Sequence, residues 1–242
     1  MSRTLRIATY NIHKCRGLDH RVRPDRIADV IAGLDADVIA LQEVMSVPRA
    51  KPEQDQIKYI AGQLSEYEWC FGENRLHAGG PYGNAILARP SIEFFCNYDL
   101  TWRNRERRGC LRADIRIREN CVLHIFNVHL GTGYVERRHQ ARHLISERVL
   151  QREDLAGPRI VVGDFNEWTR GLASRLMSES FQSVDRKMLS RYRRTYPGVL
   201  PILRLDHFYF DSALTLENFK VERNRKALVA SDHLPLVATF RL

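Results

Sequence analysis

The sequence has few features of a secreted or membrane-spanning protein. Its five cysteines are an odd number, and no two of them form a Cys-x-x-Cys pair. No apolar run reaches the roughly 18 to 20 residues that a membrane-spanning helix needs. The chain opens on Leu5–Tyr10, which is already strand-like and leaves no room for a signal peptide. We therefore expect a cytoplasmic protein whose thiols are reduced and mostly buried.

Nothing in the chain marks a boundary between domains. It has no Gly/Ser/Pro-rich linker, no low-complexity block and no repeat of fixed period. A hydrophobic share of 44% over 242 residues supplies a substantial core. Polar motifs run from residue 9 to residue 235, so a split into two domains would divide them. We predict one domain over residues 1–242.

Negative charge is in the minority. The 38 lysines and arginines outnumber the 29 acidic residues, which gives a net charge of +9. This balance favours anionic partners, namely nucleic acid, phosphoinositides or an anionic bilayer surface. The basic residues form three runs with Trp102, Tyr192 and Tyr196 among them: Arg16, Arg21 and Arg23; Arg103, Arg105, Arg107 and Arg108; and Arg191, Arg193 and Arg194. A nucleic-acid surface has this mixture, although a solvated basic face without a ligand has it too.

Hydrophobic periodicity predicts strand–helix–strand units mixed with strand meanders. Pro24 opens a helix whose apolar residues recur with helical spacing: Ile27, Val30, Ile31 and Leu34. Further helices are expected over 57–64, 137–150 and 172–177, and strands over 4–10, 37–42, 67–71, 84–88, 92–98, 111–117, 122–129, 160–162, 205–210, 216–221 and 235–242. The order indicates an α/β fold with two sheets packed face to face, rather than one doubly wound sheet.

Four short polar motifs each end a hydrophobic run. They are Thr9–His13, Leu41–Val44, Gly163–Asn166 and Ser231–Pro235. Polar side chains at the exits of buried strands are where α/β and β-sandwich enzymes keep their chemistry. An Asn, a Glu, two Asp and a His of this kind suit a hard divalent cation and a phosphate.

The acidic motifs also have structural interpretations. Glu43 follows the apolar Val38–Leu41 and needs a partner, which is either a metal or an arginine. Asp164 and Asn166 would point to the same side of an extended segment, where one accepts a proton from water and the other donates to a phosphate oxygen. The alternative is an Asx turn that caps the following helix. Adjacent Asp232 and His233 cannot face the same way, so they serve different partners.

Other polar residues extend the candidate set. Asp206 at a strand start is a natural orienting partner for a histidine. His129 ends an alternating strand and could donate to a phosphoryl oxygen, and a satisfied core histidine is the alternative. Asn84 and Arg108 are weaker candidates. Asn84 could orient a histidine or contact phosphate, and Arg108 could clamp a phosphate or be a surface arginine. Lys14, like its neighbouring histidine, is expected to position other groups or to be structural.

The ordered set of motifs resembles the endonuclease/exonuclease/phosphatase superfamily, the fold of deoxyribonuclease I, exonuclease III and neutral sphingomyelinase. The motifs stand in the family's order: Thr9-Tyr10-Asn11, Leu41-Gln42-Glu43, Gly83-Asn84-Ala85-Ile86-Leu87, Val128-His129-Leu130, Gly163-Asp164-Phe165-Asn166, Leu205-Asp206 and Ser231-Asp232-His233. The chain looks most similar to small uncharacterised bacterial members, which share an Asn-Ile-His-Lys start and a Gly-Asp-Phe-Asn-Asp/Glu-Trp segment.

This resemblance implies a four-layered α/β sandwich with two central, mostly antiparallel sheets flanked by helices. It implies Mg²⁺, or else Mn²⁺, bound by Glu43 with help from Asn11 and Asp232. The roles implied for the other residues are water activation by Asp164, acid/base catalysis or transition-state stabilisation by His233 paired with Asp206, and binding of the scissile phosphate by Asn166 and His129, with Asn84 and Arg108 as further candidates. The reaction implied is in-line phosphoryl transfer to water.

Several phosphate esters remain as substrates. The basic runs favour nucleic acid. A phospholipid or sphingomyelin-type phosphodiesterase and a small-molecule phosphatase are the alternatives, and an inactive polyanion-binding module is a remote one. His129 and the absence of an Asn-x-Tyr-x-Pro-Asn segment depart from the apurinic endonuclease branch, which disfavours abasic-site repair. A basic groove with aromatics beside the site would favour nucleic acid, whereas exposed apolar loops around its mouth would favour a lipid interface.

Overall fold

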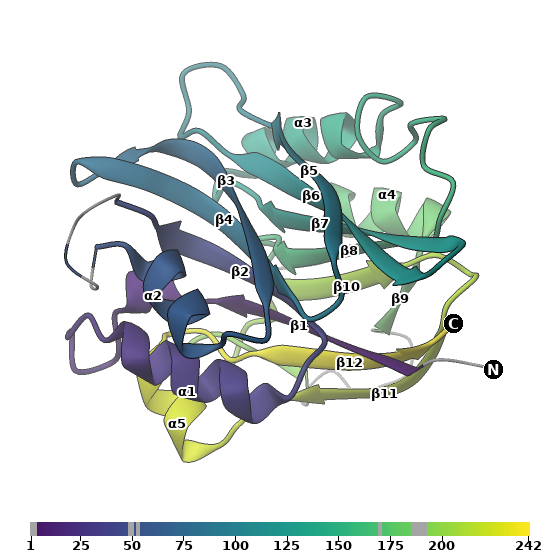
Figure 1. Ribbon diagram of the computed structural model, residues 1–242. Coiled ribbons are helices and arrows are strands. Elements are labelled where there is room, and N and C mark those ends of the chain that lie inside the picture. Colours follow the sequence, from purple (N-terminus) through teal and green to yellow (C-terminus); the bar gives the residue numbers. More distant parts are fainter. Residues whose placement is uncertain (1–3, 48–50, 52–53, 169–170, 185–192) are drawn as a thin grey trace.

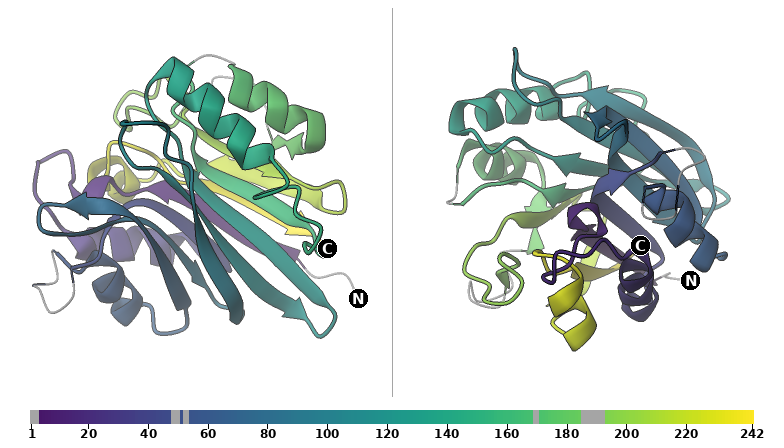
Figure 2. Two further views of the ribbon diagram at one scale, coloured as in Figure 1. Left: turned by 90° about the horizontal axis from the view of Figure 1, so that it is seen from above. Right: turned by 90° about the vertical axis from the view of Figure 1, so that its left-hand side faces the viewer.

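Two six-stranded sheets pack face to face, and helices cover their outer faces (Figure 1, Figure 2). This computed structural model describes residues 4–47, 51, 54–168, 171–184 and 193–242. The layering is the α/β sandwich that the order of elements predicted. Within the described ranges, no helix is both long enough and apolar enough to span a bilayer.

Each sheet is antiparallel apart from one central parallel pair. The first sheet has the order β11 (Thr215–Val221), β12 (Leu236–Arg241), β1 (Thr4–Asn11), β2 (Val38–Met45), β4 (Gly80–Ala88) and β3 (Glu68–His77). The second has the order β5 (Ile92–Asp99), β6 (Gly109–Arg118), β7 (Cys121–His129), β8 (Arg159–Asp164), β10 (Asp206–Phe210) and β9 (Gln182–Ser183). The parallel pairs are β1 with β2 and β7 with β8.

The inner faces of the two sheets form the central core. Alternate residues of each strand supply it, such as Leu5 and Ile7 of β1 and Leu123 and Ile125 of β7, all of which are fully buried. Burying one aliphatic side chain of this size contributes about 1.5–3 kcal/mol. The sequence alternation thus sets which face of each strand points inward.

Helices complete the outer layers. α1 (Pro24–Leu34), α2 (Gln56–Gln63) and α5 (Arg225–Ala230) cover the first sheet, while α3 (Tyr134–Ile145) and α4 (Leu172–Ser180) cover the second. Pro24 begins α1, and the four apolar residues with helical spacing are buried as predicted. The helix expected over 137–150 lies instead at Tyr134–Ile145, and the six-residue α5 was too short to show a periodicity.

The parallel pairs bring the polar motifs to one end of the sandwich. The carboxyl ends of parallel strands lie at the same edge of a sheet, so the residues after β1 and β2 are neighbours, as are those after β7 and β8. A buried hydrogen bond from Nε2 of Gln42 to Oδ1 of Asn127, 2.7 Å long, joins the two sheets there. The aliphatic core therefore gives way to a polar layer at the end where the motifs meet.

Candidate active site

Asp164, the last residue of β8, lies at the centre of the polar cluster. Its Oδ2 accepts a 3.0 Å hydrogen bond from Nδ2 of Asn11 and lies 3.6 Å from Nε2 of His129 and 3.8 Å from Nε2 of His233. Gly163 precedes it with a φ of +134°, and a Cβ there would lie 2.0 Å from the carbonyl oxygen of Val128. Only glycine therefore allows β8 to approach β7 closely enough to present Asp164.

The Asp164 carboxyl has an unusual affinity for protons. It is buried, and burial is the main reason why its pKa rises to about 7; the charge of His233 opposes the rise and that of Asp206 adds to it. A carboxylate with this pKa can hold and release a proton near neutral pH. That property suits a group that takes a proton from water.

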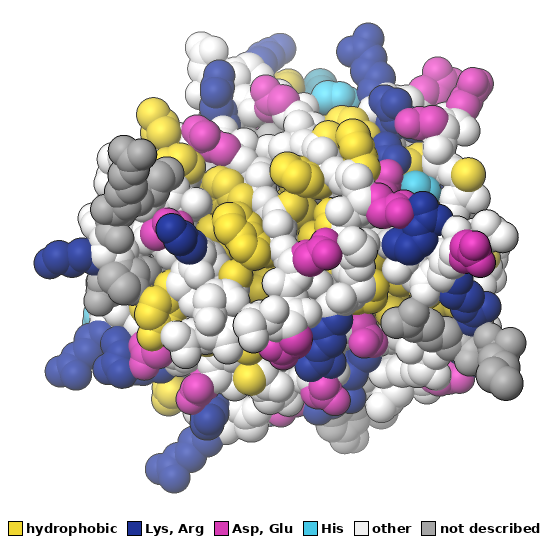
Figure 3. Space-filling model, viewed as in Figure 1, with side chains coloured by type: hydrophobic (Ala, Val, Ile, Leu, Met, Phe, Trp, Pro, Cys, Tyr) yellow, Lys and Arg dark blue, Asp and Glu magenta, His cyan; other side chains and the backbone are white. Residues whose placement is uncertain are grey.

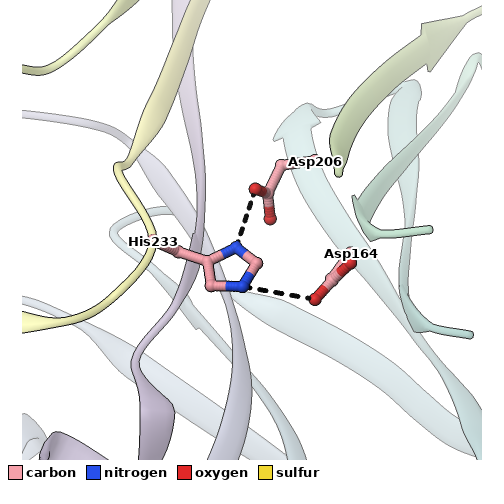
Figure 4. Close-up of side chains that lie close together, drawn as sticks. All are labelled: Asp164, Asp206 and His233. Atoms are coloured by element: carbon pink, nitrogen blue, oxygen red, sulfur yellow. Dashed lines mark hydrogen bonds and ion pairs between the residues drawn. The ribbon is translucent and has the colours of Figure 1, made fainter. Parts of the chain in front are cut away.

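His233 lies between two aspartates (Figure 4). Its Nδ1 is 2.9 Å from Oδ2 of Asp206, the first residue of β10, while its Nε2 faces Asp164. Burial alone would lower the pKa of His233, but the charge of Asp206 and its hydrogen bond outweigh burial and raise the pKa to about 10. The ring of Tyr196 packs on the imidazole with centroids 4.9 Å apart, a contact that the sequence did not reveal. The imidazole is therefore cationic and held in one orientation.

Asn166 departs from the extended geometry expected for the Gly163–Asn166 motif. Its φ is +50°, and its backbone N–H donates to Oδ1 of Asp164 over 2.8 Å, which is an Asx turn. Its side chain donates to the carbonyl oxygen of Leu130 at 2.9 Å. The expectation that Asp164 and Asn166 share one face of a strand was wrong, because the strand ends at Asp164. The cap of α4 comes from Glu167, which accepts from the backbone of the first turn.

Glu43 forms a second acidic position beside Asn11. Its Oε2 lies 2.5 Å from Nζ of Lys14, and its Oε1 accepts from Nδ2 of Asn11 at 3.3 Å. Its φ of +59° accompanies a register shift between β2 and β4. Burial opposes ionisation of Glu43, but positive neighbours that include Lys14 outweigh it and hold its pKa well below the usual range. Glu43 is thus an ionised carboxylate paired with a lysine, not with the arginine considered from the sequence.

Lys14 lies in the middle of a strained turn. His13, Lys14 and Cys15 all have positive φ, between 45° and 57°, which costs L-residues roughly 1–2 kcal/mol each. Oδ1 of Asn11 accepts from the backbone N–H of His13, and Nε2 of Gln56 donates to the carbonyl oxygen of Lys14. These bonds hold the turn in the conformation that directs Lys14 toward Glu43.

Asp232 and His233 serve different partners, as their adjacency in the sequence required. Oδ1 of Asp232 lies 3.4 Å from Nδ1 of His13, whereas His233 binds Asp206. Ser231 joins this loop to β1 by donating to the carbonyl oxygen of Asn11 at 2.8 Å. Asp232 is partly exposed and lies at the mouth of the cluster.

His129 and Arg108 form a buried pair. Nη1 of Arg108 lies 2.9 Å from Nδ1 and 3.0 Å from Nε2 of His129, and Nη2 donates to a carboxylate oxygen of Glu106 at 3.0 Å. Arg108 is buried, so it is not the surface arginine that the sequence equally allowed. Burial, followed by the charge of Arg108, lowers the pKa of His129 well below its usual value. The ring is therefore neutral and accepts from Arg108, while its Nε2 lies 3.6 Å from Oδ2 of Asp164.

Asn84 lies deeper and bridges strands. Its Nδ2 donates to the carbonyl oxygens of Gly109 and Asn127, both at 3.3 Å. Its buried Oδ1 has no hydrogen-bond partner within the described part of the chain. In these contacts Asn84 touches backbone rather than a histidine.

Two sets of residues could hold a cation. Glu43, Asp232 and the carboxamide of Asn11 offer the oxygen ligands that hard divalent cations prefer, and the Lys14 ammonium already places a positive charge against Glu43. Asp164, Asp206 and His233 form a buried group whose potential ligand atoms all lie within 4.8 Å of one another. The residues present therefore fit a divalent cation.

Comparison with known proteins gives one consistent result. The model of the endonuclease/exonuclease/phosphatase family matches residues 8–233. The uncharacterised protein YbhP of Escherichia coli is 28% identical over 99% of this chain and 97% of its own length. Among solved structures, an endonuclease/exonuclease/phosphatase family protein of Bacteroides thetaiotaomicron has a TM-score of 0.82 at 18% identity, covering 100% of this chain and 98% of that one. A mannosyl-6-phosphatase of the same organism has a TM-score of 0.81 at 18% identity, covering 98% and 99%.

Proposed function

The chain belongs to the endonuclease/exonuclease/phosphatase family, and from that membership we propose that it is a divalent-metal-dependent phosphodiesterase. Members of this family hydrolyse phosphate esters. The observation that carries the proposal is the position of Asp164, a buried carboxylate with the ring nitrogens of two histidines within 4 Å. An acid and two imidazoles directed at one point can activate water and stabilise a phosphoryl group during transfer.

Asp164 acts on the attacking water in this proposal. Its pKa of about 7 lets it accept a proton as the water oxygen approaches phosphorus. Asn11 and the backbone of Asn166 donate to its two oxygens and hold the carboxylate in one rotamer. An activated water in a fixed position is most of what an in-line displacement requires from the protein.

The two histidines act on the phosphate, and Arg108 supports one of them. Cationic His233, held by Asp206, stabilises the charge that develops on the phosphoryl oxygens and can give a proton to the leaving oxygen. Neutral His129 can donate a ring N–H to a phosphoryl oxygen, and Arg108 holds the ring in place. Asn166 supplies a further amide beside them.

A divalent cation completes the proposed site. The family is generally dependent on divalent metal, and we assign Glu43, with Asn11 and Asp232, as the ligands of Mg²⁺ or Mn²⁺. When bound, such a cation would neutralise charge on the phosphate oxygens. Lys14 would then have to leave Glu43, because an ammonium and a cation cannot occupy the same side of one carboxylate.

The predicted substrate preference rests on charge. The net charge of +9 and the arginine runs favour nucleic acid, although Arg191 and Tyr192 of the third run lie outside the described residues. An anionic phospholipid presents the same phosphate, so charge alone does not separate the two. The side chains around the mouth of the site supply a second criterion for choosing between nucleic acid and phospholipid.

Hydrolysis by the purified protein tests this function. Supercoiled plasmid, anionic phospholipid vesicles, an aryl phosphodiester and an aryl phosphomonoester would be compared in Mg²⁺, with Asp164→Ala as the contamination control. We expect turnover of the aryl phosphodiester that disappears in Asp164→Ala while the variant keeps its circular dichroism spectrum. Equal turnover by both proteins, or turnover of the monoester alone, would refute the proposal.

A further inference from the structure

Four loops surround the candidate site and are joined to one another by backbone hydrogen bonds. The backbone N–H of Leu130, after β7, donates to the carbonyl oxygen of Asp164, and that of Phe165 donates to the carbonyl oxygen of Leu205. The N–H of Leu234 donates to the carbonyl oxygen of Thr195. The loops that supply His129, Asp164, Asp206 and His233 therefore form one continuous mouth around the site.

Two of these loops and the start of α3 present large apolar side chains to solvent. These side chains, here called the apolar rim, are Tyr134, Val135, Trp168, Val199, Leu200 and Ile202. Leu200 is 72% exposed and Trp168 is 67% exposed, so neither is part of the core. The rim residues stand on the segments that these backbone hydrogen bonds hold beside the site. A group of exposed apolar side chains in one place marks an interaction surface.

The Thr195–Leu203 segment forms a hairpin whose base contacts the site. Tyr196 packs on His233 at its base, and the backbone N–H of Gly198 donates to the carbonyl oxygen of Asp232 over 2.7 Å. The backbone of Ile202 and Leu203 donates back to Tyr196, which closes the segment into a hairpin. Val199 and Leu200 at the tip of this hairpin are exposed, while its base contacts the site.

The charged side chains of these loops leave a positive surface beside the rim. Among the described acids of these loops, Asp164, Asp206, Glu136 and Glu167 are buried, and Asp232 is partly exposed and lies 3.4 Å from His13. Glu106 of the β5–β6 loop pairs with Arg75 and Arg108. The arginines of the neighbouring β5–β6 loop, Arg103, Arg105 and Arg107, are exposed. Apolar tips flanked by cations match the two layers of an anionic bilayer surface, which are the acyl boundary and the phosphates.

We propose that the apolar rim docks on the surface of an anionic phospholipid bilayer, with the candidate site facing the headgroups. This inference rests on the proposed function in naming the substrate, a phospholipid phosphodiester, but the docking itself needs no turnover. Nucleic acid is the weaker fit, because bases stack on flat aromatic side chains, whereas four of the six rim residues are aliphatic: Val135, Val199, Leu200 and Ile202. Exposed aliphatic side chains contribute binding free energy when they leave water and enter the acyl boundary.

Vesicle co-sedimentation of the full chain without metal tests the docking. We expect binding to vesicles of phosphatidylglycerol and phosphatidylcholine, little binding to phosphatidylcholine alone, and partial weakening by added salt. The double variant Leu200→Ser/Ile202→Ser should bind at least about tenfold more weakly, since its apolar contact with the acyl boundary is lost. Bilayers of brominated lipid should quench Trp168 fluorescence, as measured by comparison with Trp168→Ser.

A matched control comes from another face of the molecule. Phe94 and Phe95 on the edge strand β5 are also about half exposed, at 49% and 52%, and Figure 3 shows hydrophobic side chains on the face that carries β3 and β5. The variant Phe94→Ser/Phe95→Ser also removes two exposed apolar side chains and should keep wild-type vesicle binding. Equal binding by the rim variant and the wild type, with both proteins folded, would overturn the proposal.

Two further outcomes separate docking from catalysis. Hydrolysis of the aryl phosphodiester without any vesicle binding would leave the proposed function standing and remove the docking. Vesicle binding with no Asp164-dependent hydrolysis would leave the docking standing and refute the proposed function. If the rim variant instead lost affinity for a DNA oligonucleotide and not for vesicles, the rim would be a nucleic-acid surface and the proposal would be wrong.

Discussion

Nδ1 of His233 lies 2.9 Å from Oδ2 of Asp206, although the two residues are separated by 27 positions in the chain. Asp206 begins β10, and His233 lies in the loop between α5 and β12. The other oxygen of Asp206, Oδ1, is buried without a hydrogen-bond partner in the described ranges. Asp206 therefore uses one oxygen to orient the imidazole and to keep it charged.

This contact predicts the effect of Asp206→Asn. An asparagine keeps the volume but removes the charge and can present an amide N–H to Nδ1, which turns or neutralises the ring. We expect kcat on the aryl phosphodiester to fall by at least about 10²-fold with little change in KM. Asp211→Asn is the matched control, because it breaks the ion pair with Arg159 just beyond the other end of β10 and should leave kcat unchanged.

Metal binding should be visible without turnover. Mg²⁺ or Mn²⁺ at 100 times its dissociation constant should stabilise the native state by about 2.7 kcal/mol, which raises the thermal midpoint. In Glu43→Gln the increase should be lost, because the variant lacks the central carboxylate of the assigned ligands. Chelation should stop hydrolysis by the wild type, and added Mg²⁺ or Mn²⁺ should restore it. Full activity after exhaustive chelation would contradict the metal assignment.

Lys14 should compete with the cation for Glu43. The 2.5 Å contact must break when a metal binds that oxygen, so removing the ammonium should tighten binding. We expect Lys14→Met to lower the Mn²⁺ dissociation constant by roughly twofold to fivefold, which matches the contribution of about 1 kcal/mol or less that such an ion pair makes. Mn²⁺ electron paramagnetic resonance measures this directly, with Lys14→Arg as the charge-preserving control. Weaker binding by Lys14→Met would mean that Lys14 positions Glu43 instead.

Acid stability should depend on Asp114, far from the site. Arg112 donates to both of its oxygens and Nδ1 of His124 lies 2.7 Å from one of them. Burial would raise the pKa of Asp114, but the bonds from His124 and Arg112 outweigh it and lower the pKa. Since the folded pKa is depressed, this stability is present above the unfolded value of about 3.9 and is lost as pH falls through the folded one.

Urea unfolding at neutral and acid pH measures that contribution. Asp114→Asn should cost about 3 kcal/mol at neutral pH, because Arg112 is left buried without its partner. The difference between variant and wild type should shrink in acid, where the wild-type carboxyl is protonated. A constant difference at both pH values would show that the ion pair is not its source.

Local patterns in the sequence predicted much of the architecture. The alternation in β1 and β7 and the helical spacing in α1 depend only on which face of an element is buried, so they were readable from the residues. The ordered motifs led to the family, which the family match confirmed. The assignment of residues 1–242 to one domain, the cytoplasmic location and the roles of the site residues stay predictions.

Other features depended on contacts between distant segments. Asn166 lies in a turn rather than a strand because Asp164 and Leu130 bind it, and Lys14 reaches Glu43 because Gln56 and Asn11 hold a left-handed turn. The apolar rim, too, becomes a surface only when loops after β7, β8 and the Thr195–Leu203 segment are joined. The residues alone determined which groups were available, because burial and periodicity are local properties. The parallel pairing of β7 with β8 and the approach of the two sheets decided which groups touch, because those distances depend on the whole fold.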